Sequence, residues 1–134
     1  MRMRLPVLTL ILLGVALTAG CGGVGTSGSY DANRITADDM AGVNASDLYE
    51  VVQRLRPRWL QVRSPRGMET ETRVVVFLHR TYLGGTEELR RMGLDVAEWL
   101  EYRSGSDVVG ELSIPGSAHV QGAIIVHTSR PDGA

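Results

Sequence analysis

The chain of 134 residues has one cysteine and no lysine, and it carries no pattern that marks a catalytic centre. A single cysteine excludes an internal disulfide. All fourteen basic residues are arginine, which we attribute to the codon usage of a GC-rich genome rather than to selection for planar, bidentate donors. Serines, histidines and carboxylates are present, but no nucleophile-elbow motif connects them, so the sequence gives no reason to expect an enzyme.

The three histidines, His79, His119 and His127, lack the spacings that metal sites use, such as His-x-Glu or His-x-x-x-His. His79 and His127 fall at the ends of expected strands and His119 in an expected loop. Only the fold could bring them together. We therefore expect ordinary strand-edge and loop histidines, with no metal and no cofactor.

The first twenty residues have the pattern of an export signal. Arg2 and Arg4 precede an apolar segment at 5–17, and small residues follow at 18–20. This apolar segment is too short to span a bilayer and ends at a small-residue cleavage site. We expect residues 1–20 to be a signal peptide.

The segment Leu17-Thr18-Ala19-Gly20-Cys21 resembles the lipobox of bacterial lipoproteins, whose cysteine is lipidated. The resemblance implies acylation of Cys21 and a soluble domain held at the membrane surface. An ordinary signal peptide is the alternative, and it would leave an exposed free thiol. Gly22 follows the cysteine in place of an inner-membrane retention aspartate, which favours the outer membrane with the domain facing the periplasm.

Removal of residues 1–20 leaves twelve basic and fifteen acidic residues, a net charge of about −3. An acidic balance argues against nucleic acid as the partner. Residues 22–34 are rich in glycine and serine, and we expect 21–34 to be the lipidated cysteine and a flexible tether reaching roughly 20 Å. The remaining length suits one domain at 35–130 and a short tail at 131–134.

Helix signals dominate the first part of this domain. Thr36 and Asp39 have the spacing of a capping box, with Ile35 and Met40 as a hydrophobic staple. An apolar stripe at 48–55 predicts a helix that starts at Asn44 or Ser46 and ends before Pro57. Alternation at 59–63 predicts a strand, followed by a turn at 64–67.

Residues 74–78 are consecutive and apolar, which predicts a central strand buried on both faces. After it we expect an extended piece at 82–83, a short helix capped by Thr86 and stopped by Gly93, and a helix at 107–112 capped by Ser106. Helix and strand compete at 95–103, and a strand at 97–102 is preferred. A loop at 115–121 leads to a last strand at 123–128. The pattern predicts an α+β fold with a small mixed sheet of three to five strands and short helices.

Six arginines form a basic stretch with Trp59 inside it: Arg54, Arg56, Arg58, Arg63, Arg66 and Arg73. Arginine beside an aromatic ring suits phosphate, carboxylate or anionic headgroups. The alternative is a solvated face whose side-chain stems pack on the tryptophan. The candidate anion or partner contacts are Arg54, Arg56, Arg58, Trp59, Arg63 and Arg66.

The order of these segments resembles the plug domain of TonB-dependent outer-membrane receptors. Residues 76–85, with Val-Phe-Leu followed by His79-Arg80, match a Val-Tyr-Val-Asp-Gly-like strand, and residues 89–99 match the short helix and the following strand. Residues 122–130 match the terminal Gly-Val-Ile-Asn-Ile-like strand, and residues 35–57 match the opening segment and helix. His79-Arg80 stands where the family has Asp-Gly, and 114–121 looks lengthened.

The resemblance implies a plug-like fold over residues 35–130 and a partner such as an outer-membrane receptor. The chain has too few residues for a membrane barrel, and the tether shows no energy-coupling box, so transport and TonB dependence are not expected. The leading hypothesis is a lipid-anchored, non-catalytic binding or adaptor module. The alternative is a stand-alone periplasmic protein that binds or senses a small solute.

Overall fold

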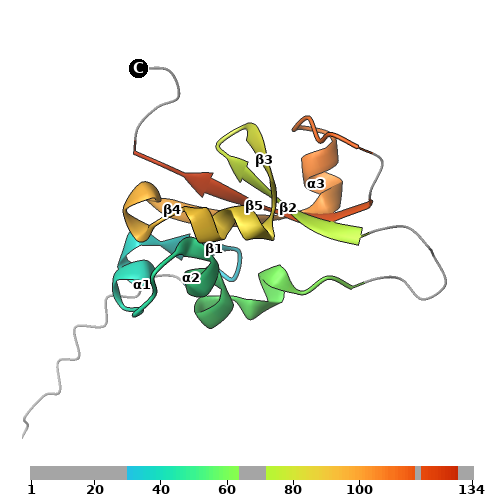
Figure 1. Ribbon diagram of the computed structural model, residues 1–134. Coiled ribbons are helices and arrows are strands. Elements are labelled where there is room, and N and C mark those ends of the chain that lie inside the picture. The colour runs from blue at the N-terminus through green and yellow to red at the C-terminus, as the bar shows by residue number, and fades with distance from the viewer. Residues whose placement is uncertain (1–29, 64–71, 117–118, 130–134) are drawn as a thin grey trace, which may run out of the picture. The chain divides into compact units, whose positions relative to one another are not determined.

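A computed structural model describes residues 30–63, 72–116 and 119–129, and the compact unit begins at Asp31. Its centre is a five-stranded sheet with the order β1-β4-β5-β2-β3, in which β2 and β5 are parallel and the other neighbours antiparallel (Figure 1). The strands are β1 (Arg34–Thr36), β2 (Thr72–Leu78), β3 (Thr81–Gly85), β4 (Trp99–Ser104) and β5 (His119–His127).

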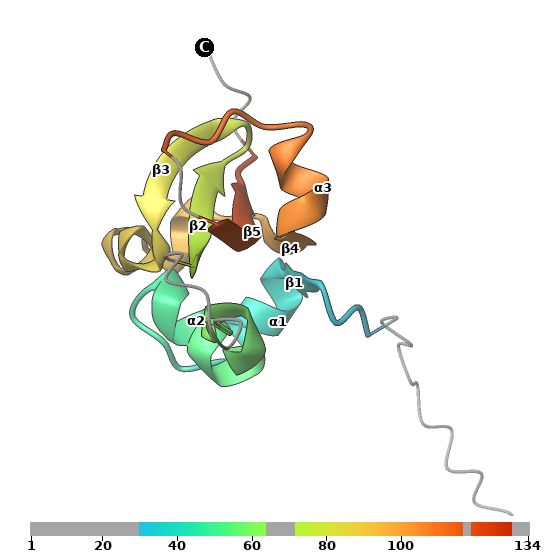
Figure 2. The same ribbon diagram turned by 90° about the vertical axis from the view of Figure 1, so that its right-hand side faces the viewer.

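The helical segments are short, and most lie on one face of the sheet. They are α1 (Ala37–Ala41), α2 (Leu48–Leu55), the 3₁₀ segments η1 (Pro57–Leu60), η2 (Thr86–Arg91) and η3 (Leu94–Val96), and α3 (Gly105–Val109). In both views α1 and α2 lie on the side of the sheet opposite α3 (Figures 1 and 2). The predicted α+β fold with a mixed sheet and few short helices is confirmed.

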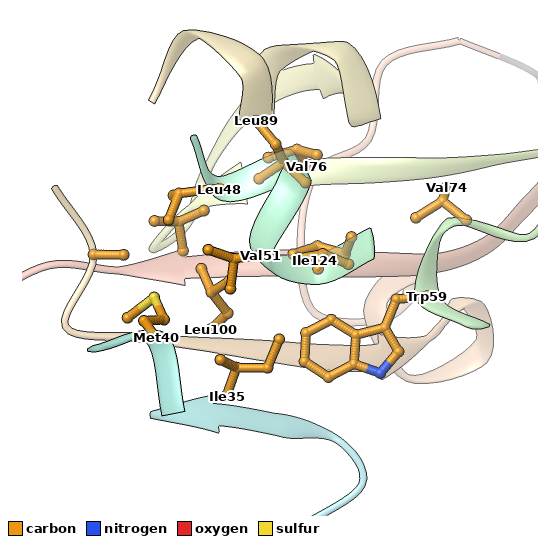
Figure 3. Close-up of a cluster of buried hydrophobic side chains, with 13 residues drawn as sticks. Ile35, Met40, Leu48, Val51, Trp59, Val74, Val76, Leu89, Leu100 and Ile124 are labelled. Carbon is orange, nitrogen blue, oxygen red and sulfur yellow. The ribbon is translucent and has the colours of Figure 1, made fainter. Parts of the chain in front are cut away.

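The larger core lies between the sheet and the layer of α1, α2, η1 and η2. Leu48, Val51 and Val52 supply the apolar stripe of α2, and all three are fully buried. They pack with alternate residues of the strands, including Ile35 and Leu100 (Figure 3). Because side chains in a strand alternate between faces, the intervening residues of β2 and β5 point away from this layer.

The smaller core lies on the other face, where α3 packs against β5. It contains Val75, Phe77, Ala123 and Ile125 from these strands, together with Val108 of α3 and its neighbours. Residues 74–77 are therefore buried from both sides, as the apolar run predicts. In sheet order, however, β5 rather than β2 is the middle strand, because the 79–80 turn brings β3 back along the edge of β2.

Several predicted boundaries are confirmed. Thr36 caps α1, and it forms the expected capping box with Asp39. The side chains of the predicted staple, Ile35 and Met40, are both buried in the larger core. The second predicted helix is α2, although Asp47 rather than Asn44 or Ser46 is its N-cap.

Other predicted elements are wrong. Residues 57–60 form a 3₁₀ turn, and 61–63 have no regular structure, so the expected strand at 59–63 is absent. Pro57 at the start of η1 fixes a helical backbone angle there, and burial of the Trp59 side chain favours the turn over an exposed strand. The turn predicted at 64–67 lies outside the described residues.

The predicted caps of the later helices are also wrong. Gly85 rather than Thr86 is the N-cap of η2, and Ser104 rather than Ser106 is the N-cap of α3. The strand predicted at 97–102 is β4 at Trp99–Ser104. The last strand begins at His119 instead of 123, so His119 is a strand residue, and the loop predicted at 115–121 is correspondingly shorter.

The domain begins earlier than the sequence predicts. Residues 31–34, assigned above to the tether, are bonded to the fold. The backbone N–H of Tyr102 donates to the carbonyl of Asn33 (2.8 Å), and Arg34 starts β1. Within the described ranges no helix is long and apolar enough to cross a membrane.

Candidate functional site

The sheet face that carries α3 also carries polar and aromatic side chains from β4 and β1. α3 packs against β5 and contacts β4, and its Val108 joins the smaller core with Val75 and Phe77 of β2. The side chains that point from β4 and β1 toward this side include Arg34, Trp99, Glu101 and Arg103. Among these four side chains Arg34 is exposed and the other three are half-buried.

Four planar side chains form a row across the end of the sheet, which we call the ladder: Arg34, Trp99, His127 and His79. The Arg34 guanidinium lies 3.8 Å from the centre of the Trp99 ring. The His127 ring stacks on Trp99, with centroids 3.6 Å apart and planes within 6°. His79 meets His127 edge to face at 5.6 Å. Because β1 and β5 flank β4 from opposite sides, the indole is held between a guanidinium and an imidazole.

Both imidazoles are fixed by hydrogen bonds. Nε2–H of His127 donates to the Glu101 carboxylate at 3.3 Å. Burial lowers the pKa of His127, an effect that the bond to Glu101 opposes and the neighbouring His79 and Arg34 reinforce. Neutral His127 is therefore the favoured form at neutral pH.

His79 is positioned by an unusual backbone conformation. It is the first residue of the two-residue turn between β2 and β3, and its φ is 51°. Such turns require a left-handed residue, and Asn, Asp or Gly are its usual occupants. The backbone N–H of Thr128 donates to His79 Nε2 at 3.3 Å, and the Thr128 hydroxyl lies 3.0 Å from the same atom. A histidine held in this region costs about 1–3 kcal/mol, which points to a use for its ring.

Beside the ladder the surface is hollowed, with a volume of about 560 Å³. One wall carries an ion pair between Arg103 and Glu111 at 2.5 Å. This contact raises the pKa of Arg103 and lowers that of Glu111. The residues around the hollow are His79, Arg80, Glu98, Glu101, Arg103, Glu111, Leu112, Ile125, His127, Thr128 and Ser129.

The groups around the hollow define the contacts that this site offers. Among the described residues no group of three or more histidine, cysteine, aspartate or glutamate side chains is placed to hold a metal. His127 has a carboxylate partner in Glu101, but its known contacts are aromatic rings and Glu101, not a serine, threonine or cysteine nucleophile. Hydrogen-bonding groups of both charges surround an open hollow, an arrangement suited to a polar ligand or to the polar rim of a protein interface.

The predicted basic stretch does not form one surface. The Trp59 ring is buried, stacks on Tyr102 at 5.7 Å and donates its N–H to the carbonyl of Ala32. Arg54 pairs with Glu50, and Arg56 donates to the carbonyls of Asp31 and Arg34. The aromatic part of the predicted contact is therefore unavailable to a partner.

The remaining arginines of that stretch have different positions. Arg58 and Arg63 are exposed. Arg66 lies outside the described residues, as does Cys21. Arg58 and Arg63 are thus exposed, whereas the guanidinium of Arg56 is hydrogen-bonded to backbone carbonyls.

Sequence reasoning missed the ladder. Its members lie at positions 34, 79, 99 and 127, and their spacing matches no motif. A partial signal was present, since His79 and His127 were both expected at strand ends, and the sequence showed that only the fold could join them. The registers Trp99 to His127 and Thr36 to Trp99 place these residues side by side.

Comparisons with known proteins add no relative. No protein-family description, no curated protein and no solved structure matches the chain.

Proposed function

We propose that this protein is a lipid-anchored, non-catalytic binding or adaptor module of the bacterial envelope, held at the outer membrane through Cys21 and facing the periplasm. The observation that carries the binding role is the hollow beside the ladder, which charged side chains of both signs surround. An open, polar surface of this kind suits a macromolecular partner better than it suits enclosure of a substrate. Export and anchoring rest on the amino-terminal sequence pattern.

The plug-like order of segments is the reason to propose an envelope protein, such as an outer-membrane receptor, as the partner. In chain order the elements are β2, the 79–80 turn, β3, η2, η3, β4, α3 and β5. The strand, tight turn, short helix and later strands of the resemblance occur in this order, with β3, η3 and α3 between them. No residue in this scheme performs a reaction, and no cofactor takes part.

Site-specific photo-crosslinking in cells tests the adaptor role. A photoreactive residue at Glu98, which is exposed beside both the ladder and the hollow, is expected to trap a specific envelope protein. The matched control is Gln53, exposed on α2 on the opposite side of the sheet. Equal crosslinking from the two positions, or none from Glu98, would count against the site.

Anchoring has its own test. Cys21→Ser is expected to move the exported protein from the membrane fraction to the soluble periplasmic fraction, because the lipid chains supply most of the membrane affinity. Metabolic labelling with a fatty acid measures the modification directly. Labelling that persists in the variant would contradict lipidation at Cys21.

A second function is favoured by the size of the hollow. Its volume of about 560 Å³ lies within the range of small-ligand sites, roughly 300–1,000 Å³. A periplasmic protein that binds or senses a small solute would use the same residues. A thermal-shift screen separates the two functions, since one solute class should raise the unfolding temperature only if the hollow is a solute site.

A further inference from the structure

The chain enters the domain at one particular end of the sheet. β1 runs antiparallel to β4, so residues 31–33 lead back from Arg34 toward Ser104, which is opposite Gly122 in β5. Tyr102 holds Asn33 there through its backbone N–H. β5 and the parallel β2 begin at this same end, where Thr72 is opposite His119.

The basic segment 56–63 is fastened to the same end. Arg56 donates to the carbonyls of Asp31 and Arg34 at 3.1 and 3.3 Å, and Trp59 donates to that of Ala32 at 3.2 Å. The side chain of Gln121, near the start of β5, accepts from the backbone N–H of Arg63 and donates to the carbonyl of Gln61. These bonds place residues 56–63 beside the point where the tether joins the domain.

Two guanidinium groups of this segment remain available to a partner. Arg58 and Arg63 are exposed, and within the part of the chain that the structure describes neither forms an ion pair within 4.0 Å. The nearby acid on the entering chain is Asp31, whose carboxylate accepts from the backbone N–H of Asn33. Exposed positive charge therefore adjoins the attachment point of the tether.

We propose that Arg58 and Arg63 form a membrane-facing surface that docks the anchored domain on anionic phospholipid headgroups. This proposal rests on the lipid anchor proposed above. Nine residues separate Cys21 from Asp31, and a random coil of that length reaches about 15–18 Å. That distance keeps the end of the domain where the tether attaches near the headgroups, and guanidinium groups bind phosphates bidentately. The ladder lies at the other end of the sheet, so docking leaves it turned toward the periplasm.

The test uses residues 21–134 with Cys21→Ser, so that the contribution of lipid acylation is removed. Flotation with vesicles of phosphatidylcholine alone, or with phosphatidylglycerol added, measures binding. We expect binding only to the anionic vesicles, weakened by salt, and about fivefold weaker for Arg58→Glu or Arg63→Glu. The control is Arg80→Glu, an equal change of charge in the exposed turn at the opposite end of β2, which should bind like the parent.

The outcomes are distinct. Equal binding to both vesicle types, or an equal loss in Arg80→Glu, would overturn the docking surface, even if fatty-acid labelling had established the anchor. Conversely, vesicle binding that depends on Arg58 and Arg63 would support the docking surface even if labelling showed that Cys21 is not lipidated. Thermal unfolding of each variant checks that it folds. If either variant does not fold, the salt dependence of vesicle binding by the parent protein tests the proposal.

Discussion

Replacing Gly105 by alanine is expected to displace α3 from the sheet. A β-carbon at Gly105 would lie 2.8 Å from the carbonyl carbon of Val120 and closer still to its oxygen. Both atoms belong to the backbone of β5, so a change of side-chain rotamer cannot relieve the clash. Relief requires the start of α3 to move by more than about 1 Å, because the oxygen is the closer atom and ordinary contacts begin near 3.4 Å.

The loss of stability follows from what α3 and the turn after it bury. Val108 of α3 is fully buried, Leu112 after it is nearly so, and both pack on Val75, Phe77 and Ile125. Burial of each such side chain contributes about 1.5–3 kcal/mol, so partial loss of both predicts a destabilisation of about 2–4 kcal/mol. That is a large part of the roughly 5–15 kcal/mol that holds a small domain folded.

Urea unfolding followed by circular dichroism measures the difference in the free energy of unfolding. Gly110→Ala is the matched control at the other end of the same helix, since no atom lies within 4 Å of its added β-carbon and its φ is −80°. It should be neutral or slightly stabilising. If Gly105→Ala unfolds within about 0.5 kcal/mol of the parent, the packing of α3 against β5 is not as described.

Two further predictions concern the cap and the ladder. Thr36→Ala should lower stability by about 1 kcal/mol. It should also raise the pKa of Asp39 in part: the backbone N–H of residue 36, which is the larger cause of the low pKa, still donates to the carboxylate, but the hydroxyl no longer does. NMR titration of the carboxyl measures this pKa, and an unshifted value would contradict the hydrogen bond from the Thr36 hydroxyl. Since the pKa of His127 is lower in the folded than in the unfolded chain, stability should fall as pH drops below about 6.5. His127→Phe keeps a ring against Trp99 and should weaken this dependence of stability on pH, measured by denaturant titrations from pH 7 to 5. An unchanged dependence would show that groups other than His127 take up the protons.

The helices near the amino end of the domain could be predicted because their signals are local. The capping box of Thr36 and the apolar stripe of α2 involve residues within one or two turns of each other, and the same atoms make the contacts in the fold. The strand at 59–63 failed because alternation over five residues is a weak signal. Burial of the Trp59 ring against Tyr102 outweighed it.

By itself the sequence determined the class of fold and the apolar run that β2 buries on both faces. These features depend on neighbouring residues and on periodicity. Only the tertiary structure decided that Arg34, Trp99, His127 and His79 form one row, because strand register, not spacing along the chain, sets which side chains meet. The same holds for the arginines. Long-range hydrogen bonds to the carbonyls of Asp31 and Arg34 hold Arg56 in the fold, whereas Arg58 and Arg63 stay exposed.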